Sequence, residues 1–188
     1  MPQASESPVS DAIPEKDTAV FEAEIAARMA AADTVAIAHE RLERVFPEQI
    51  AGYAVDVDKA STFATNRFAF SEAIRVFYDE REEYIELIIG DYVADPDFFR
   101  ANLQRYNEAG GREIDGVIEE KISGANWTPA WASDFFAWRL YNRPRRLARF
   151  YVGIDRRYFL TVEASGRDAP LAVEEIRNWV DWGALRKE

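Results

Sequence analysis

Two pairs of alternating segments constrain the fold of this chain more than any other feature of its sequence. Residues 70–78 and 84–93 alternate on either side of a charged turn, and residues 146–154 and 158–164 alternate across a tight turn near Asp155-Arg156. A period of two is typical of β-strands, and strands joined by short turns pair antiparallel. The chain therefore predicts at least two β-hairpins.

The second of these segments, from Tyr84 to Val93, is apolar on both faces. One face carries Ile85, Leu87 and Ile89, and the other carries Tyr84, Ile88 and Tyr92. A strand that is apolar on both faces is buried on both, so we expect it at the centre of a sheet with cover above and below.

The N-terminal part of the domain has helical spacing from Thr18 to Phe46. Asp17 or Thr18 can cap this helix, and Asp33-Thr34 can divide it into two. Apolar positions recur three and four residues apart and predict one buried stripe. The stripe consists of Phe21, Ile25, Met29, Ala32, Val35, His39, Leu42 and Phe46.

Two further helices are delimited by proline and glycine. Asp95 is an expected N-cap with Pro96 at the first helical position, and that helix ends near Gly110-Gly111. Pro170 opens a final helix, with Val173, Ile176 and Val180 facing inward, that we expect to end at Gly183.

Residues 114–123 and 127–142 fit both helical and strand spacing. We assign both as strands, because Gly116 weakens a helix in the first and aromatic side chains are dense in the second. The whole pattern predicts an α+β domain over residues 18–188, with one antiparallel sheet packed by helices. Three or four strands are expected after the helix that starts at Pro96.

Residues 1–17 contain three Pro, three Ser and hardly any large apolar side chain. This composition predicts a disordered linker or arm. Such an arm is typical both of a processed exported protein and of an ordinary chain terminus. The location is periplasmic or at the cell envelope in the first case and cytoplasmic in the second.

Four segments carry a resemblance to known proteins: FPEQIAGY, YIELIIGDY, FYVGIDRRYFLTVEASG and VDWGALRKE. They resemble a group of small bacterial exported proteins or lipoproteins of unknown function. The layout is similar to the Mog1/PsbP-like α/β/α sandwich of helix, antiparallel sheet and helix. The resemblance covers residues 45–188, is structural, and implies no catalytic residue. This sequence departs from the group in lacking a signal segment and a lipid-attachment cysteine.

Charge and composition exclude several classes of function. With 23 Lys and Arg against 34 Asp and Glu, the net charge is -11, which argues against nucleic acid as a partner. The chain has no cysteine and one histidine, so thiolate catalysis and paired imidazoles are excluded. No apolar run approaches the roughly 18 residues of a transmembrane helix. We expect no metal, cofactor or catalytic residue.

The basic segment from Arg139 to Arg157 is the candidate site. It holds seven arginines and one acid, Asp155, so it carries +6 while the remainder of the chain carries -17. We expect Arg145, Arg149 and Tyr151 to share the face opposite the core, with Arg157 nearby, and to hold phosphate or carboxylate. The full candidate set is Arg139, Arg143, Arg145, Arg146, Arg149, Tyr151, Arg156, Arg157, Trp131 and Trp138.

Each part of this candidate has a structural alternative. The guanidinium groups can instead pair with carboxylates such as Asp79, Glu80, Glu82, Glu83 and Glu86. Trp131 and Trp138 can stack on a planar ligand or anchor a partner, and they can equally pack in the core.

The sequence therefore favours a non-catalytic binding or interaction module, tethered at the bacterial cell envelope by its arm. Its expected partner is an acidic protein or a small anion, and self-association of the basic segment with an acidic face of a second copy stays open. The alternative is a small-molecule enzyme or carrier with a cavity between sheet and helix.

Overall fold

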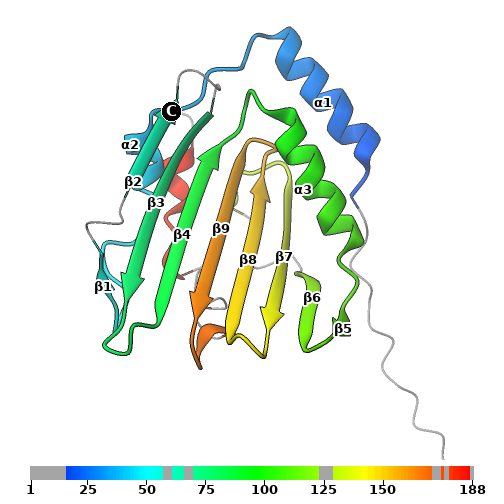
Figure 1. Cartoon of the computed structure of the whole chain (residues 1–188). Helices are drawn as coiled ribbons and strands as arrows, with labels where there is room; N and C mark the ends of the chain where they lie inside the picture. The colour runs from blue at the N-terminus through cyan, green and yellow to red at the C-terminus, as the bar shows by residue number, and fades with distance from the viewer. Residues whose placement is uncertain are drawn as a thin grey trace, which may run out of the picture.

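The computed structural model describes residues 16–56, 61–65, 70–122, 129–170, 175 and 178–186. In these residues the chain forms one nine-stranded antiparallel sheet with helices against both faces (Figure 1). The strand order is β1-β3-β4-β9-β8-β7-β6-β5, and β2 also pairs with β3. The predicted α+β class with an antiparallel sheet is confirmed.

The strands are β1 (Ala54–Val55), β2 (Ser61–Thr65), β3 (Phe70–Tyr78), β4 (Tyr84–Asp91), β5 (Arg112–Ile114), β6 (Val117–Ile122), β7 (Phe135–Asn142), β8 (Leu147–Ile154) and β9 (Tyr158–Ser165). The helices are α1 (Thr18–Ala30), α2 (His39–Glu43), α3 (Pro96–Glu108) and the short 3-10 helix η3 (Trp182–Leu185). No helix in the described part of the chain is long and apolar enough to cross a membrane.

Both predicted hairpins are confirmed. β3 pairs with β4 from Tyr78 opposite Tyr84, and β8 pairs with β9 from Ile154 opposite Tyr158. In the second turn Asp155 and Arg156 have φ of 51° and 50°, left-handed values that match the twist of a tight hairpin. The Asp155 carboxylate accepts hydrogen bonds from the backbone N–H groups of Ser133 and Asp134, which holds this turn against the start of β7.

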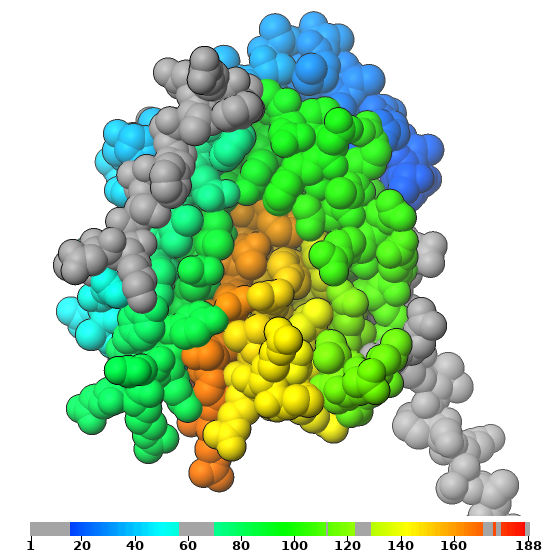
Figure 2. Space-filling view, viewed as in Figure 1, coloured from blue at the N-terminus to red at the C-terminus, as the bar shows by residue number. Residues whose placement is uncertain are grey.

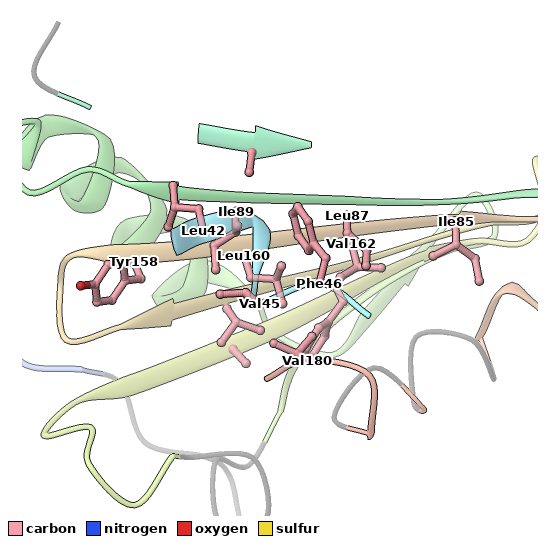
Figure 3. Packing of buried hydrophobic residues seen from close by; sticks show 14 of the residues in the cluster. Leu42, Val45, Phe46, Ile85, Leu87, Ile89, Tyr158, Leu160, Val162 and Val180 are labelled. Atoms are coloured by element: carbon pink, nitrogen blue, oxygen red, sulfur yellow. The ribbon is translucent and has the colours of Figure 1, made fainter. Parts of the chain in front are cut away.

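β4 lies near the middle of the sheet, as predicted, and its back face, the one opposite α3, is covered by α2 and the C-terminal segment. The expected cover on its front face is wrong, because Tyr84, Glu86 and Ile88 are only half-buried there. Figure 3 shows side chains of the short helix and the turn after it meeting β4 and β9 in the back core. These side chains are Leu42, Val45, Phe46, Ile85, Leu87, Ile89, Leu160, Val162 and Val180. The inward positions predicted for β8 and β9 are all buried.

The front face of the sheet is covered by α3 over its upper part only (Figure 1). α3 begins at the predicted cap, because the Asp95 side chain accepts a hydrogen bond from the backbone of Phe98. Its buried side chains pack on β7 and β9, and Phe21 of α1 completes the group. This front aromatic cluster consists of Phe21, Phe99, Leu103, Tyr106, Ala109, Phe136, Trp138 and Phe159.

The N-terminal helical segment is divided, and its predicted stripe is only partly buried. α1 ends at Ala30 and α2 begins at His39, with extended chain between them. Extended chain breaks the helical period, so Val35 is 78% exposed. Met29, in the last turn of α1, is 49% exposed, while Phe21 and Leu42 are buried. The prediction that one stripe runs through Val35 is therefore wrong.

The prediction of one strand over residues 114–123 needs correction, because the chain makes a hairpin here. β5 and β6 pair across the turn Asp115-Gly116, whose φ values are 51° and 77°. Five strands rather than three or four therefore follow α3. Two further strands, β1 and β2, precede β3.

The other boundary predictions have mixed outcomes. The strand within 127–142 is confirmed over Phe135–Asn142, and residues 129–134 lie outside it. Gly183 lies inside η3 rather than at the end of a helix, and Val180 is buried as expected. The predictions for Val173 and Ile176, and for residues 1–15 of the arm, fall outside the described residues.

Candidate binding face

The seven arginines of the basic segment lie in three separate places. Arg143, Arg145 and Arg146 lie in or next to the turn between β7 and β8, and Arg156 and Arg157 lie in the turn at the other end of β8. The eight residues of β8 separate the two turns by about 25 Å. The expectation that Arg157 lies near Arg145 is therefore wrong.

The remaining two arginines, Arg139 and Arg149, lie in the sheet on opposite faces. Arg139 is directly opposite Phe150, a residue of the back core, whereas Arg149 is directly opposite Leu140 and faces the front. Neighbouring positions along a strand point to opposite faces, so two arginines on paired strands do not gather in one patch.

Five of the seven guanidinium groups pair with carboxylates. Arg143 binds Glu113 at 3.1 Å, and the other four pairs are Arg139 with Glu120, Arg149 with Glu163, Arg156 with Glu24 and Asp134, and Arg157 with Asp33 and Asp91. Pairing was one of the two expected outcomes. The acids differ from those expected, because they come from strands, helices and loops adjacent in space rather than from the 79–83 turn.

The pair of Arg157 and Asp91 is the most deeply buried. Asp91 is fully buried and Arg157 is 5% exposed, with Nη2 of the arginine 2.7 Å from the carboxylate. The same carboxylate accepts a hydrogen bond from the backbone of Ile37, and Arg157 donates to the carbonyl of Val35. The pair thus fastens the extended segment between α1 and α2 to the sheet.

Arg145 and Arg146 are exposed and form no ion pair with any residue that the structure describes. Among the predicted site residues they are the two cations left for an acidic partner. Two hydrogen bonds stabilise their turn: the backbone N–H of Arg145 donates to the Asn142 side chain, and that of Arg146 donates to the Arg143 carbonyl.

The two candidate tryptophans are packed in the two cores. Trp138 is 1% exposed under α3 and stacks on Tyr151 with ring centroids 4.7 Å apart. Trp131 is half-buried beside the back core, where its ring meets Tyr158 edge to face. These contacts match the core-packing interpretation of both residues.

The lower part of the front face is not covered by α3, and we call it the open face. Figure 2 shows β9 in orange and β8 in yellow at the molecular surface below α3. Alternation along the strands brings half-buried side chains to this surface. Among them are Tyr78, Tyr84, Glu86, Ile88, Leu140, Arg149 and Glu163.

One row across the open face joins five strands in direct register. Glu86 of β4 is opposite Glu163 of β9, which is opposite Arg149 of β8. Val76 of β3 lies beside Glu86, and Leu140 of β7 lies beside Arg149; the same register continues from Leu140 to Glu119 of β6. The row therefore places two carboxylates and one guanidinium on neighbouring strands.

Both oxygens of Glu163 are occupied. The Tyr84 hydroxyl donates to Oε1 of Glu163, and Nε of Arg149 donates to Oε2. The phenol is partly buried and already bonded to a carboxylate, and these two causes raise the pKa of Tyr84. The hydrogen bond to Glu163 and its charge raise the pKa of Arg149 against the opposing effect of burial.

Glu86, unlike Glu163, has no partner among the described residues. Its side chain forms no hydrogen bond or ion pair with the described residues. Burial, and secondarily the charge of Glu163, raise the pKa of Glu86, and Arg149 offsets part of this effect. A half-buried acid beside a second acid favours any cation that can reach it.

Two of the cavities in the described part of the chain do not include Glu86. One of about 130 Å³ is lined by β6, β7, β8 and Pro170, includes the paired Glu120 and Arg139, and also borders Leu140 and Arg149. The other, of about 210 Å³, lies where the end of α3 meets the β5–β6 hairpin, beside Glu108 and Glu119. Neither is lined by Glu86 or Tyr84, so the acid with a raised pKa lies on the open face and not in these cavities.

Comparison with known proteins adds no assignment to this geometry. No protein family, no curated protein and no solved structure matches the chain.

Sequence reasoning missed the open face as a site. It named Arg149 as a binding residue and Glu86 only as a salt-bridge partner, and it did not single out Tyr84 or Glu163. The available signal was the alternation of Tyr84, Glu86 and Ile88, which places a carboxylate in the middle of an otherwise apolar strand face.

Proposed function

We propose that this chain is a non-catalytic binding domain that receives its ligand or partner on the open face. The observation that supports the proposal is Glu86, a half-buried carboxylate with no described partner on a sheet face that α3 leaves uncovered. Rigid β-strands hold the residues of this face, which suits a preformed binding surface.

A screen of small molecules and peptides by NMR with the purified chain tests this function. We expect hits to shift the amide signals of β4 and β9, and to be recovered chemically unchanged after incubation. Binding should be lost in Glu86→Arg, because the new side chain fills the open face and pairs with Glu163. The matched control is Glu80→Arg, which makes the same charge change at an exposed position of the β3–β4 turn.

Two results contradict the proposal. One is a screen in which nothing binds the open face in a saturable way. The other is a set of hits that Glu86→Arg leaves unaffected, which would place the binding surface elsewhere.

The small-molecule enzyme or carrier is the second candidate. It is favoured by the cavity of about 210 Å³ between the end of α3 and the β5–β6 hairpin, which matches the expected position between sheet and helix. Chemical conversion of a hit, with loss of turnover in a variant of Glu108 or Glu119, would favour this candidate over the binding domain.

Two arginines of the basic segment are still proposed to bind an acidic partner. Arg145 and Arg146 are the cations available to an acidic protein or a small anion, or to the acidic open face of a second copy. Analytical ultracentrifugation tests self-association. If the chain self-associates through these arginines, its apparent mass should rise with concentration, and the double variant Arg145→Glu, Arg146→Glu should not show this rise.

We further propose the Mog1/PsbP-like layout and a tether at the bacterial cell envelope. The antiparallel sheet with helices on both faces supports the layout, and the Pro- and Ser-rich composition of residues 1–17 supports the tether. Fractionation of the native cells, with mass spectrometry of the mature N-terminus, tests the location. Recovery of the protein in the cytoplasm would contradict it.

A further inference from the structure

We propose that the open face takes an organic cation on an alkyl stem, the guanidinium or ammonium group of an arginine or lysine side chain, with Glu86 as its anchor. This inference rests on the proposed binding function and names the ligand chemistry of the same face.

The charge balance of the row is the first argument. Glu86 and Glu163 are directly opposite on β4 and β9, which places their Cβ atoms about 5 Å apart on one face. Like charges in this position repel, and Arg149 is the cation that the row supplies. A second cation beside Glu86 would complete two alternating charge pairs.

Arg149 does not serve both acids. Its Nε group is bonded to Glu163, and its side chain also bonds Tyr151. β9 lies between β8 and β4, so the backbones of Arg149 and Glu86 are two strand spacings apart, about 9.5 Å. Glu86 is therefore left for a group from outside the chain.

The surroundings of Glu86 fit the stem of such a group. Tyr84 and Ile88 flank Glu86 two positions away on the same strand and are half-buried on the same face. Tyr78 lies opposite Tyr84, with ring centroids 6.0 Å apart. Aliphatic and aromatic surface next to a carboxylate suits side chains that carry a cation on methylene groups, and the rings add cation–π attraction.

The molecule already contains the same recognition once. The guanidinium of Arg149 binds Glu163 and is hydrogen-bonded to Tyr151, and a ligand guanidinium at Glu86 would be a second pairing of a guanidinium with a carboxylate next to a tyrosine. A metal ion fits less well, because the described residues contain no group of three His, Cys, Asp or Glu placed to hold one.

An NMR titration with two matched probes tests the inference. Nα-acetyl-arginine amide carries the cation, and Nα-acetyl-citrulline amide is its neutral isostere. We expect the arginine probe to give saturable shifts at the amides of residues 76–78 and 84–88, and the citrulline probe to give none. Lysine amide should shift the same backbone amide signals.

Two variants locate the anchor. Glu86→Gln should weaken arginine binding by about tenfold or more, since it removes a charge-assisted hydrogen bond. Glu80→Gln removes the same charge from the exposed turn of the same hairpin and should leave the affinity unchanged. Unchanged amide signals outside the open face confirm that each variant is folded. The comparison of the arginine and citrulline probes uses the unmodified chain, so it does not depend on the folding of any variant.

Equal binding of citrulline, full affinity in Glu86→Gln, equal loss in Glu80→Gln, or no saturable shifts with arginine would each overturn the inference. If other compounds still bind the open face, the inference fails and the binding function stands. If nothing binds there, both fail.

Discussion

Glu86 and Glu163 lie directly opposite each other on β4 and β9, with their carboxylates on the same uncovered face of the sheet. Glu163 is bonded to Tyr84 and Arg149, and Glu86 is not bonded to either. The open face therefore has one carboxylate whose oxygens are hydrogen-bonded and one carboxylate, Glu86, without a hydrogen-bond partner among the described residues.

Glu86→Gln should stabilise the protein at neutral pH. The pKa of Glu86 is raised in the fold by burial and by Glu163, so its favourable contribution is present below the ordinary carboxyl pKa of 4.5 and is lost as pH rises through the folded-state value. Glutamine has no charge to bury. We expect a gain of less than about 1 kcal/mol, because Glu86 is partly exposed.

Thermal unfolding at several pH values measures this difference. The groups that face Glu86 are Glu163 and Arg149 across the sheet and Tyr84 on its own strand, with Val76 on the other side. The gain should be seen at pH 7 and should disappear near pH 4. A Glu86→Gln protein less stable than the parent at pH 7 would show that the carboxylate has a stabilising partner.

Arg149→Ala should destabilise the protein by about 1 kcal/mol, a value reduced for the partial exposure of the pair. The substitution removes the cation bonded to Glu163 and leaves two opposed carboxylates. Urea unfolding checks it, with Arg145→Ala as the control of equal size at an exposed turn. The double variant Arg149→Ala, Glu163→Gln should recover part of the loss, and a fully additive loss would argue against coupling.

Asp91→Ala should be far more costly, about 3–5 kcal/mol, because it leaves the guanidinium of Arg157 buried without its main partner. The same variant frees the backbone N–H of Ile37. Hydrogen exchange should therefore accelerate in the segment between α1 and α2. Asp97→Ala, an exposed carboxylate in the first turn of α3, is the control. A loss no larger than in this control would mean that the buried pair does not hold the segment.

The hairpins and the start of α3 could be predicted from local sequence. Alternation with turn residues defines β3–β4 and β8–β9, and Asp95-Pro96 is both an N-cap and a first-turn proline. The β5–β6 hairpin was missed although Asp115-Gly116 is a typical hairpin turn. Gly116 argues against a helix in this segment, but this alone does not show that the segment contains a turn.

The candidate site could not be predicted in the same way, because it depends on register between distant segments. Glu86 meets Glu163 only because β4 pairs with β9, and Arg157 meets Asp91 at the far end of the same pairing. Local alternation places Arg149 on a face but does not say which strand lies beside it. The basic segment therefore predicted an arginine patch, where the structure has arginines distributed among separate carboxylates.

The pKa of the Glu86 carboxyl, followed by carbon NMR with and without the arginine probe, tests the account most directly. The account predicts a value above the ordinary 4.5 in the free protein, and a lower value when the probe is bound, because a bound cation favours the charged form. A free-protein pKa at or below the ordinary value, or a pKa that saturating probe leaves unchanged, would contradict it.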